Sequence, residues 1–68
     1  MIYKSDNGYT GTFKEGNFFG FKHYDLTIFD PEGKFVFHAT YTEPITYDDL
    51  KDEVDNYPEF LKELQKLN

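Results

Sequence analysis

The sequence predicts an α+β fold: a four-stranded antiparallel β-meander with a C-terminal kinked or broken helix packed on one face. Three observations predict it. Apolar side chains recur at every second position through much of residues 1–42, as they do in a strand with one buried face. Three turn-forming clusters divide this region into four short strands. From residue 46 onwards, apolar residues are spaced by three and four, which is the period of a helix.

The chain has 68 residues, and we expect a single domain, with the β-meander over residues 1–42 and the helical segment over residues 46–67. A domain this short hides only about 60% of its unfolded surface, so its core needs large side chains. Eight phenylalanines and six tyrosines supply them. The sequence has no cysteine, which excludes disulfide bonds and thiolate metal sites.

The net charge is −6 and is concentrated toward the C-terminus. Residues 1–42 hold four lysines against five acids, and residues 43–68 hold three lysines against eight acids. This balance, together with the lack of arginine, argues against direct nucleic-acid binding, which depends on cations at phosphates. No segment has the roughly 18 apolar residues of a membrane span, and the N-terminus lacks the pattern of a signal peptide. We therefore expect a cytoplasmic protein without membrane contact.

The first reversal is predicted at Asn7-Gly8, the strongest short signal for a two-residue type I′ loop. This loop would pair Ile2 with Phe13 and turn Tyr3 to the opposite face of the sheet. We expect Ile2 on the inner face, directed toward the helix, and Tyr3 on the outer face.

The second reversal is predicted at Gly16-Asn17, again as a two-residue loop. This loop would pair Phe13 with Gly20. The phenyl ring would then cover the bare glycine backbone, and the glycine would let a long strand bend.

The third reversal is Asp30-Pro31-Glu32-Gly33, in which proline sets the first corner of a type I turn and the glycine supplies a left-handed residue. A three-residue loop would place Phe29 opposite Phe35 and mix apolar with polar groups on both faces. A four-residue loop places Phe29 opposite Lys34 and separates the faces, so we favour it. The predicted inner face then carries Ile2, Tyr9, Phe13, Tyr24, Leu26, Ile28, Phe35, Phe37, Ala39 and Tyr41.

The helix is expected to begin at Thr46, an N-cap that can form a capping box with Asp49. Pro58 lacks a backbone donor and crowds the carbonyl four residues earlier, so we expect a kink or break near residues 56 and 57 and a second helical segment beyond it. The apolar stripe that faces the sheet is formed by Leu50, Val54, Tyr57, Leu61 and Leu64.

The outer sheet face carries the first candidate for function, a set of apolar side chains: Phe19, Phe21, Phe29 and Val36. Monomeric proteins rarely expose large contiguous apolar patches, so the set predicts a contact surface for a protein partner or for a second copy of the chain. The alternative is that the N-terminus covers Phe19 and Phe21 or that these two residues lie on a twisted edge of the sheet, and isolated surface apolar residues are common.

Three polar residues, His23, Asp25 and His38, are predicted to meet on the same outer face, with Asp25 opposite His38. Two imidazoles and a carboxylate could bind a divalent metal ion or serve an enzymatic site. We favour a cross-strand polar pair, because a flat meander offers no concave pocket for a metal centre. No cofactor is expected.

The helix carries the second candidate surface, formed by Asp48, Asp52, Glu53 and Asp55. An acidic surface could dock a basic partner through charge complementarity. The alternative, which we favour, is that these acids complement the helix macrodipole and keep a small protein soluble.

No pattern typical of catalysis is present. Ser5 is the only serine and lies in a predicted turn, and the glycines near residue 16 precede no helix that could receive a phosphate. We predict a small acidic, non-enzymatic protein-binding or regulatory module that acts through the aromatic sheet face, the acidic helix, or both. The alternatives are a structural homodimer formed through the outer sheet face and, more weakly, a divalent-metal or enzymatic site at His23, Asp25 and His38.

Overall fold

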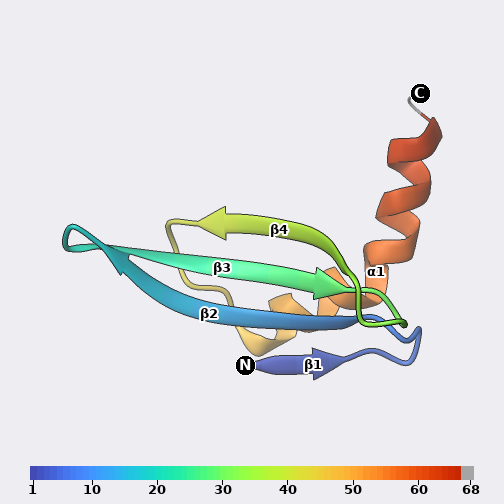
Figure 1. Ribbon diagram of the computed structural model, residues 1–68, viewed down its shortest axis with the longest axis horizontal. Helices are drawn as coiled ribbons and strands as arrows, with labels where there is room; N and C mark the ends of the chain where they lie inside the picture. The colour runs from blue at the N-terminus through green and yellow to red at the C-terminus, as the bar shows by residue number, and fades with distance from the viewer. Residues whose placement is uncertain (67–68) are drawn as a thin grey trace.

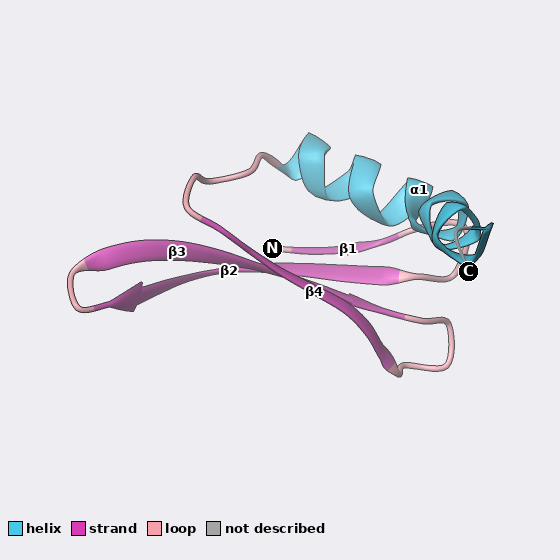
Figure 2. Ribbon diagram, turned by 90° about the horizontal axis from the view of Figure 1, so that it is seen from above, coloured by secondary structure: helices cyan, strands magenta, loops and turns pink. Residues whose placement is uncertain are grey.

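The structure, a computed structural model, describes residues 1–66 and contains four strands followed by one helix. The elements are β1 (Ile2–Lys4), β2 (Thr10–Phe18), β3 (Phe21–Phe29), β4 (Phe35–Tyr41) and α1 (Tyr47–Lys66). The strands form one antiparallel sheet in the order β1-β2-β3-β4, and α1 lies on one face of it (Figures 1 and 2). This arrangement confirms the predicted α+β fold. The predicted helix end at residue 67 lies outside the described residues.

The core lies between α1 and the inner face of the sheet. It is formed by Phe13, Leu26, Ile28, Leu50, Val54 and Tyr57. Burial of each such side chain contributes about 1.5–3 kcal/mol, so these six residues account for much of the packing. Half-buried side chains surround them: Tyr3, Tyr9, Tyr24, Phe37, Tyr41, Ile45 and Leu61. Most of the predicted inner face is therefore confirmed, apart from Ile2 and Phe35.

Gly11 on β2 lets α1 approach the sheet closely. A Cβ atom at this position would overlap Cγ2 of Val54 and lie 3.0 Å from Cδ1 of Leu50. The helix thus rests directly on the backbone of β2, and it packs most closely on β1 and β2. The inner face near β4 is covered less closely.

The predicted β1–β2 register is wrong by one residue. Tyr3 pairs with Gly11 and packs against the core, whereas Ile2 is exposed. The connection is wider than a two-residue loop, and it is closed by the Ser5 N–H, which donates to the Tyr9 carbonyl at 2.8 Å. The wider loop lets the Asn7 side chain reach α1. Local turn preferences take no account of such a tertiary contact.

The predicted β2–β3 reversal is also wrong, because Phe19-Gly20 makes the turn and Gly16-Asn17 lies within β2. Both turn residues have positive φ, 51° and 81°, as a type I′ turn requires. Phe13 therefore pairs with Leu26, six positions from its predicted partner. Because six is an even number, the predicted faces are unchanged. The longer ladder adds cross-strand pairs, which favour it over the earlier turn.

The β3–β4 connection is a three-residue loop, closed by the Asp30 N–H, which donates to the Lys34 carbonyl at 2.8 Å. Phe29 consequently pairs with Phe35, and the predicted pairing with Lys34 is wrong. A β-bulge between Ile28 and Phe29 then restores the separation of the two faces. Phe35 lies beyond the bulge and is 62% exposed, so its predicted inner position is wrong as well.

The start of α1 confirms the predicted capping box. The Thr46 N–H donates to Asp49 Oδ2 at 3.0 Å, and the Asp49 N–H donates to Thr46 Oγ1 at 3.1 Å. The helix continues through Pro58 as one element and bends there: its first half follows the sheet and its second half projects away (Figures 1 and 2). The predicted kink is confirmed and the predicted break is not. In residues 1–66, no helix is long and apolar enough to cross a membrane.

Candidate functional site

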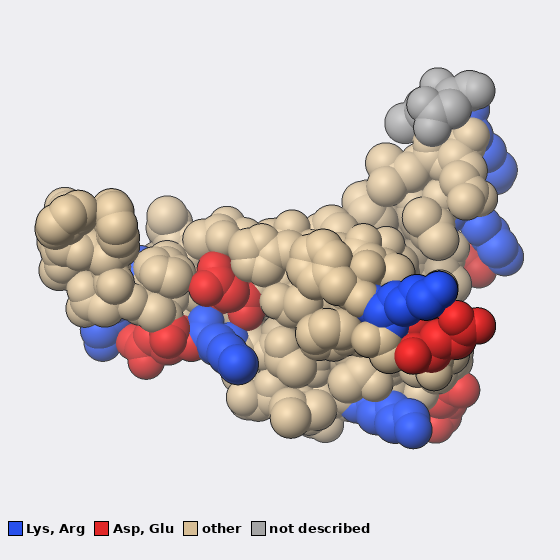
Figure 3. Space-filling view, in the orientation of Figure 1, with Lys and Arg blue, Asp and Glu red and all other residues tan. Residues whose placement is uncertain are grey.

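Strands β2 and β3 form an arm that extends beyond α1 and ends in three exposed phenylalanines (Figure 1). The exposed fractions are 66% for Phe18, 85% for Phe19 and 77% for Phe21. The rings of Phe18 and Phe19 meet edge to face, with centroids 4.5 Å apart, and Phe18 pairs with Phe21 across the strands. We name these three residues the arm patch. Figure 3 shows it as an uncharged lobe at the end of the molecule remote from the C-terminal half of α1.

The backbone of Phe19 is strained. Its φ of 51° lies in the left-handed region, which costs an L-residue with a bulky side chain roughly 1–2 kcal/mol. Asn17 supports the turn, because its Oδ1 accepts a hydrogen bond from the Gly20 N–H at 3.0 Å. Neither burial nor backbone preference accounts for a phenylalanine at this position.

The structure divides the predicted aromatic surface into two parts. Phe19 and Phe21 lie in the arm patch together with Phe18, which the sequence interpretation did not select, although all three cluster within four consecutive residues. Phe29 and Val36 lie at the opposite end of the sheet, where Phe29 is half-buried. Eight residue steps along β3 separate Phe21 from Phe29, which corresponds to about 26 Å. The two parts are too far apart to act as one patch.

His23, Asp25 and His38 come together on the outer face, although Asp25 pairs with Thr40 and the predicted pairing with His38 is wrong. The Asp25 carboxylate lies 3.4 Å from His23 Nδ1 and 3.6 Å from His38 Nε2. It accepts a hydrogen bond from Thr40 Oγ1 at 2.9 Å. His23 Nδ1 is buried, and its contact with Asp25 is too poorly aligned to count as a hydrogen bond. Among residues 1–66, no group of three or more histidine and acidic side chains is arranged to hold a metal ion.

A shallow depression on the outer face joins the arm patch to this polar cluster. It is lined by Phe18, Phe21, Lys22, His23, Asp25, Thr40 and Thr42. The arm patch therefore continues into a mixed apolar and polar surface along β3 and β4.

Asp55, one of the predicted interface residues, is bound within the fold. Its carboxylate accepts hydrogen bonds from Ser5 Oγ at 2.5 Å and from the Tyr3 hydroxyl at 2.7 Å. These two donors hold the pKa of Asp55 below its ordinary value, and the hydrogen bond to Asp55 raises the pKa of Tyr3. Asp55 thus ties β1 and the following loop to α1.

The other predicted acidic residues, Asp48, Asp52 and Glu53, are exposed on α1. Asp48 lies in the first turn, where its charge complements the helix macrodipole. Asp52 and Glu53 lie beyond that turn, and within residues 1–66 neither forms an ion pair with a lysine or histidine.

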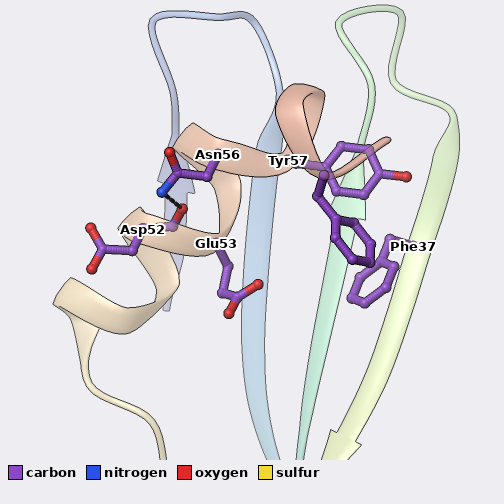
Figure 4. Close-up of a pocket in the computed structure, with 6 residues that line it drawn as sticks. Phe37, Asp52, Glu53, Asn56 and Tyr57 are labelled. Atoms are coloured by element: carbon purple, nitrogen blue, oxygen red, sulfur yellow. Dashed lines mark hydrogen bonds between the residues drawn. The ribbon is translucent and has the colours of Figure 1, made fainter. Parts of the chain in front are cut away.

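Asp52 and Glu53 line a pocket that was not predicted from the sequence. It has a volume of about 270 Å³ and lies between α1 and β4, at the bend of the helix (Figure 4). Its other lining residues are Phe37, Asn56, Tyr57 and Phe60. The only sequence signal for it is that Tyr57 and Phe60, three residues apart, flank the helix-bending proline.

No protein-family model, curated protein or solved structure matches the chain. The architecture alone defines its class: a small α+β domain in which a bent helix covers a four-stranded meander. Its function has to be argued from the geometry of the arm patch and the pocket.

Proposed function

We propose that this chain is a small, non-enzymatic binding module whose arm patch inserts into an apolar pocket of a basic protein partner. The single observation that carries the proposal is the exposure of Phe18, Phe19 and Phe21 at the end of a projecting arm. Aromatic residues are enriched in protein interfaces, and adjacent exposed rings are unusual on a monomer. An arm that protrudes from the fold can enter a concave surface that a flat sheet face could not.

The backbone strain at Phe19 supports the same proposal. Left-handed backbone at a bulky residue destabilises the free protein and is found preferentially at functional positions. Asparagine or glycine would make this turn at lower cost. The phenyl ring at the tip is therefore better explained by a contact with a partner than by folding.

The charge of the chain supports a basic partner. With a net charge of −6, two copies repel each other, whereas a basic protein is attracted and steered toward the domain. Asp52 and Glu53 are exposed and available for such a partner. The cytoplasmic location remains a prediction from the sequence.

The test compares variants of the arm against one reconstituted partner. A protein captured by the wild-type chain is purified, and its affinity is measured for wild type, Phe19→Asp and Phe21→Asp. We expect each arm variant to bind at least about tenfold more weakly, as interface anchors do. Phe35→Asp is the matched control, since Phe35 is also exposed but lies at the other end of the sheet. Equal binding by wild type and both arm variants would contradict the proposal.

A homodimer is the second candidate, because β4 pairs only with β3 within residues 1–66 and is therefore an edge strand, and edge strands can pair with a second chain. Sedimentation velocity of wild type and Phe21→Asp separates the two candidates. A dimer that is lost in Phe21→Asp would favour self-association through the arm and outer face, and a dimer that persists in this variant would favour pairing of β4 edges. A wild-type monomer at high concentration would remove this candidate.

A further inference from the structure

The pocket between α1 and β4 has aromatic walls. The ring centroids of Phe37 and Tyr57 are 5.8 Å apart, those of Phe37 and Phe60 are 6.1 Å apart, and those of Tyr57 and Phe60 are 6.2 Å apart. Phe37 comes from β4, and the other two rings come from the two sides of the bend in α1. Phe60 is 46% exposed although it contacts both other rings, so part of its surface lines open space.

The bend at Pro58 creates this space. The first half of α1 rests closely on β1 and β2, and the second half leaves the sheet, so the helix does not close over Phe37 (Figures 1 and 4). The Tyr57 hydroxyl donates to the Val36 carbonyl at 3.3 Å, which fixes the Tyr57 ring against β4. The walls are therefore held in place by the fold.

A carboxylate stands beside the aromatic walls. In Figure 4 the Glu53 side chain extends from α1 on the side where Phe37 lies, whereas the Asp52 side chain points away from the rings. The pKa of Tyr41 on β4 is raised mainly by burial and further by the negative charge of Glu53. The electrostatic effect of Glu53 therefore extends to the sheet. Glu53 has no cationic partner among the described residues.

We infer that this pocket binds an arginine side chain presented by a protein partner. Aromatic faces attract cations, and the planar guanidinium group stacks on rings while it donates to a carboxylate. A guanidinium group is also less strongly hydrated than an ammonium group, which favours arginine over lysine between apolar walls. Only the protein nature of the ligand rests on the proposed function; the chemistry of recognition rests on the pocket itself.

The size of the pocket fits this ligand. Pockets that enclose whole small molecules usually have volumes of about 300–1,000 Å³, and this one, at about 270 Å³, lies below that range. A single long side chain can enter it with its methylene groups against the rings and its charged end beside Glu53.

The test uses two capped tripeptides, acetyl-Gly-Arg-Gly-amide and its counterpart with citrulline, a neutral residue of nearly the same shape, in place of arginine. Each is titrated into the isotope-labelled full chain and followed by NMR. We expect saturable shifts at Phe37, Glu53, Tyr57 and Phe60 with the arginine peptide, with a dissociation constant in the millimolar range that suits one side chain. The citrulline peptide should produce shifts at least fivefold smaller.

Two variants locate the binding. Glu53→Gln removes the carboxylate charge and Phe60→Ala removes a partly exposed wall, and each should weaken arginine-peptide binding by about three- to tenfold. Glu63→Gln is the matched control, because Glu63 is paired with Lys66 on an exposed part of α1 and should leave binding unchanged. Equal shifts with both peptides, or shifts spread over every acidic residue of α1, would overturn the inference.

The outcome of the peptide titration can be distinguished from the outcome of the partner-binding test of the proposed function. Arginine-peptide binding that persists in Phe19→Asp would leave the pocket assignment intact even if the arm patch proved irrelevant to the partner. Conversely, loss of partner binding in Phe19→Asp together with no saturable peptide shift would remove the pocket assignment alone.

Discussion

The side chain of Asn7 supplies a hydrogen bond that Pro58 cannot make. Asn7 Nδ2 donates to the Val54 carbonyl at 3.1 Å and to the Asp55 carbonyl at 3.2 Å. In a regular helix, the Val54 carbonyl would accept from the N–H of residue 58, but proline has none. The β1–β2 loop thus satisfies backbone groups at the bend of α1, 47 and 48 residues later in the sequence.

We expect Asn7→Ala to destabilise the domain by about 1 kcal/mol, because the partly buried Val54 carbonyl of α1 loses its donor. Urea denaturation followed by circular dichroism measures the change. A double-mutant cycle with Pro58→Ala isolates the cause. An alanine N–H at position 58 can satisfy Val54 directly, so the effect of Asn7→Ala should fall by about 0.5 kcal/mol or more in that background. An undiminished effect would show that Asn7 acts only within its own loop.

The close approach of α1 to β2 predicts that Gly11→Ala is destabilising. The added methyl group would overlap Val54 Cγ2 and force the helix from the sheet, at an expected cost of about 1–3 kcal/mol. Gly16→Ala is the matched control in the same strand. The three heavy atoms nearest its methyl group would all belong to the imidazole of His23, which can rotate away. Thermal denaturation should show a clearly lower midpoint for Gly11→Ala than for Gly16→Ala, and equal midpoints would contradict the packing argument.

Asp55 should make the domain sensitive to acid. Its pKa in the folded state is lowered from the ordinary value of 3.8 by the Ser5 and Tyr3 hydroxyl groups. A carboxyl group with a depressed folded pKa stabilises the protein above its unfolded pKa, and this contribution is lost as the pH falls through the folded pKa. We therefore expect the stability advantage of wild type over Asp55→Asn to shrink as the pH decreases below about 4.

The measurement is the free energy of unfolding of both proteins across that pH range. Ser5→Ala, which removes one of the two donors, should reduce the acid sensitivity without abolishing it. Parallel pH profiles for wild type and Asp55→Asn would exclude Asp55 as the source.

Phe19→Asn should stabilise the free domain by about 1 kcal/mol, because asparagine tolerates the left-handed conformation of the β2–β3 turn. The same change at Phe21, which has an extended backbone, should give no such gain and serves as the control. Thermal denaturation tests this. A lower stability of Phe19→Asn would show that the ring contributes to the fold and would weaken the case for the arm patch.

Most residues were assigned to the correct face of the sheet although the predicted turns were wrong, because a register change by an even number of residues leaves the faces unchanged. The β2–β3 turn was displaced so that the register changed by six positions, and a bulge between Ile28 and Phe29 corrected the β3–β4 register. Leu26 and Ile28 therefore lie in the core as predicted. At β1 the error was a single residue, so Tyr3 and Ile2 exchanged faces.

The candidate sites were less predictable than the fold. Exposed aromatic residues on the sheet were expected, but their concentration in the arm patch depends on the true position of the turn at Phe19-Gly20. The pocket depends on where α1 bends relative to Phe37, a residue far from Tyr57 and Phe60 in the sequence. No periodicity or motif relates such distant positions.

The sequence by itself determined the α+β class, most of the inner face of the sheet, the start of α1 and its bend at Pro58, since these follow from apolar period, capping chemistry and the missing proline donor. Tertiary structure decided the loop lengths, the role of Asp55, the arm patch and the pocket. Turn lengths depend on the total pairing and packing of the chain, and local preferences differ by too little energy to fix them. The contact of Asn7 with α1 illustrates this, because a long-range hydrogen bond accompanies a loop that the local signal alone did not predict.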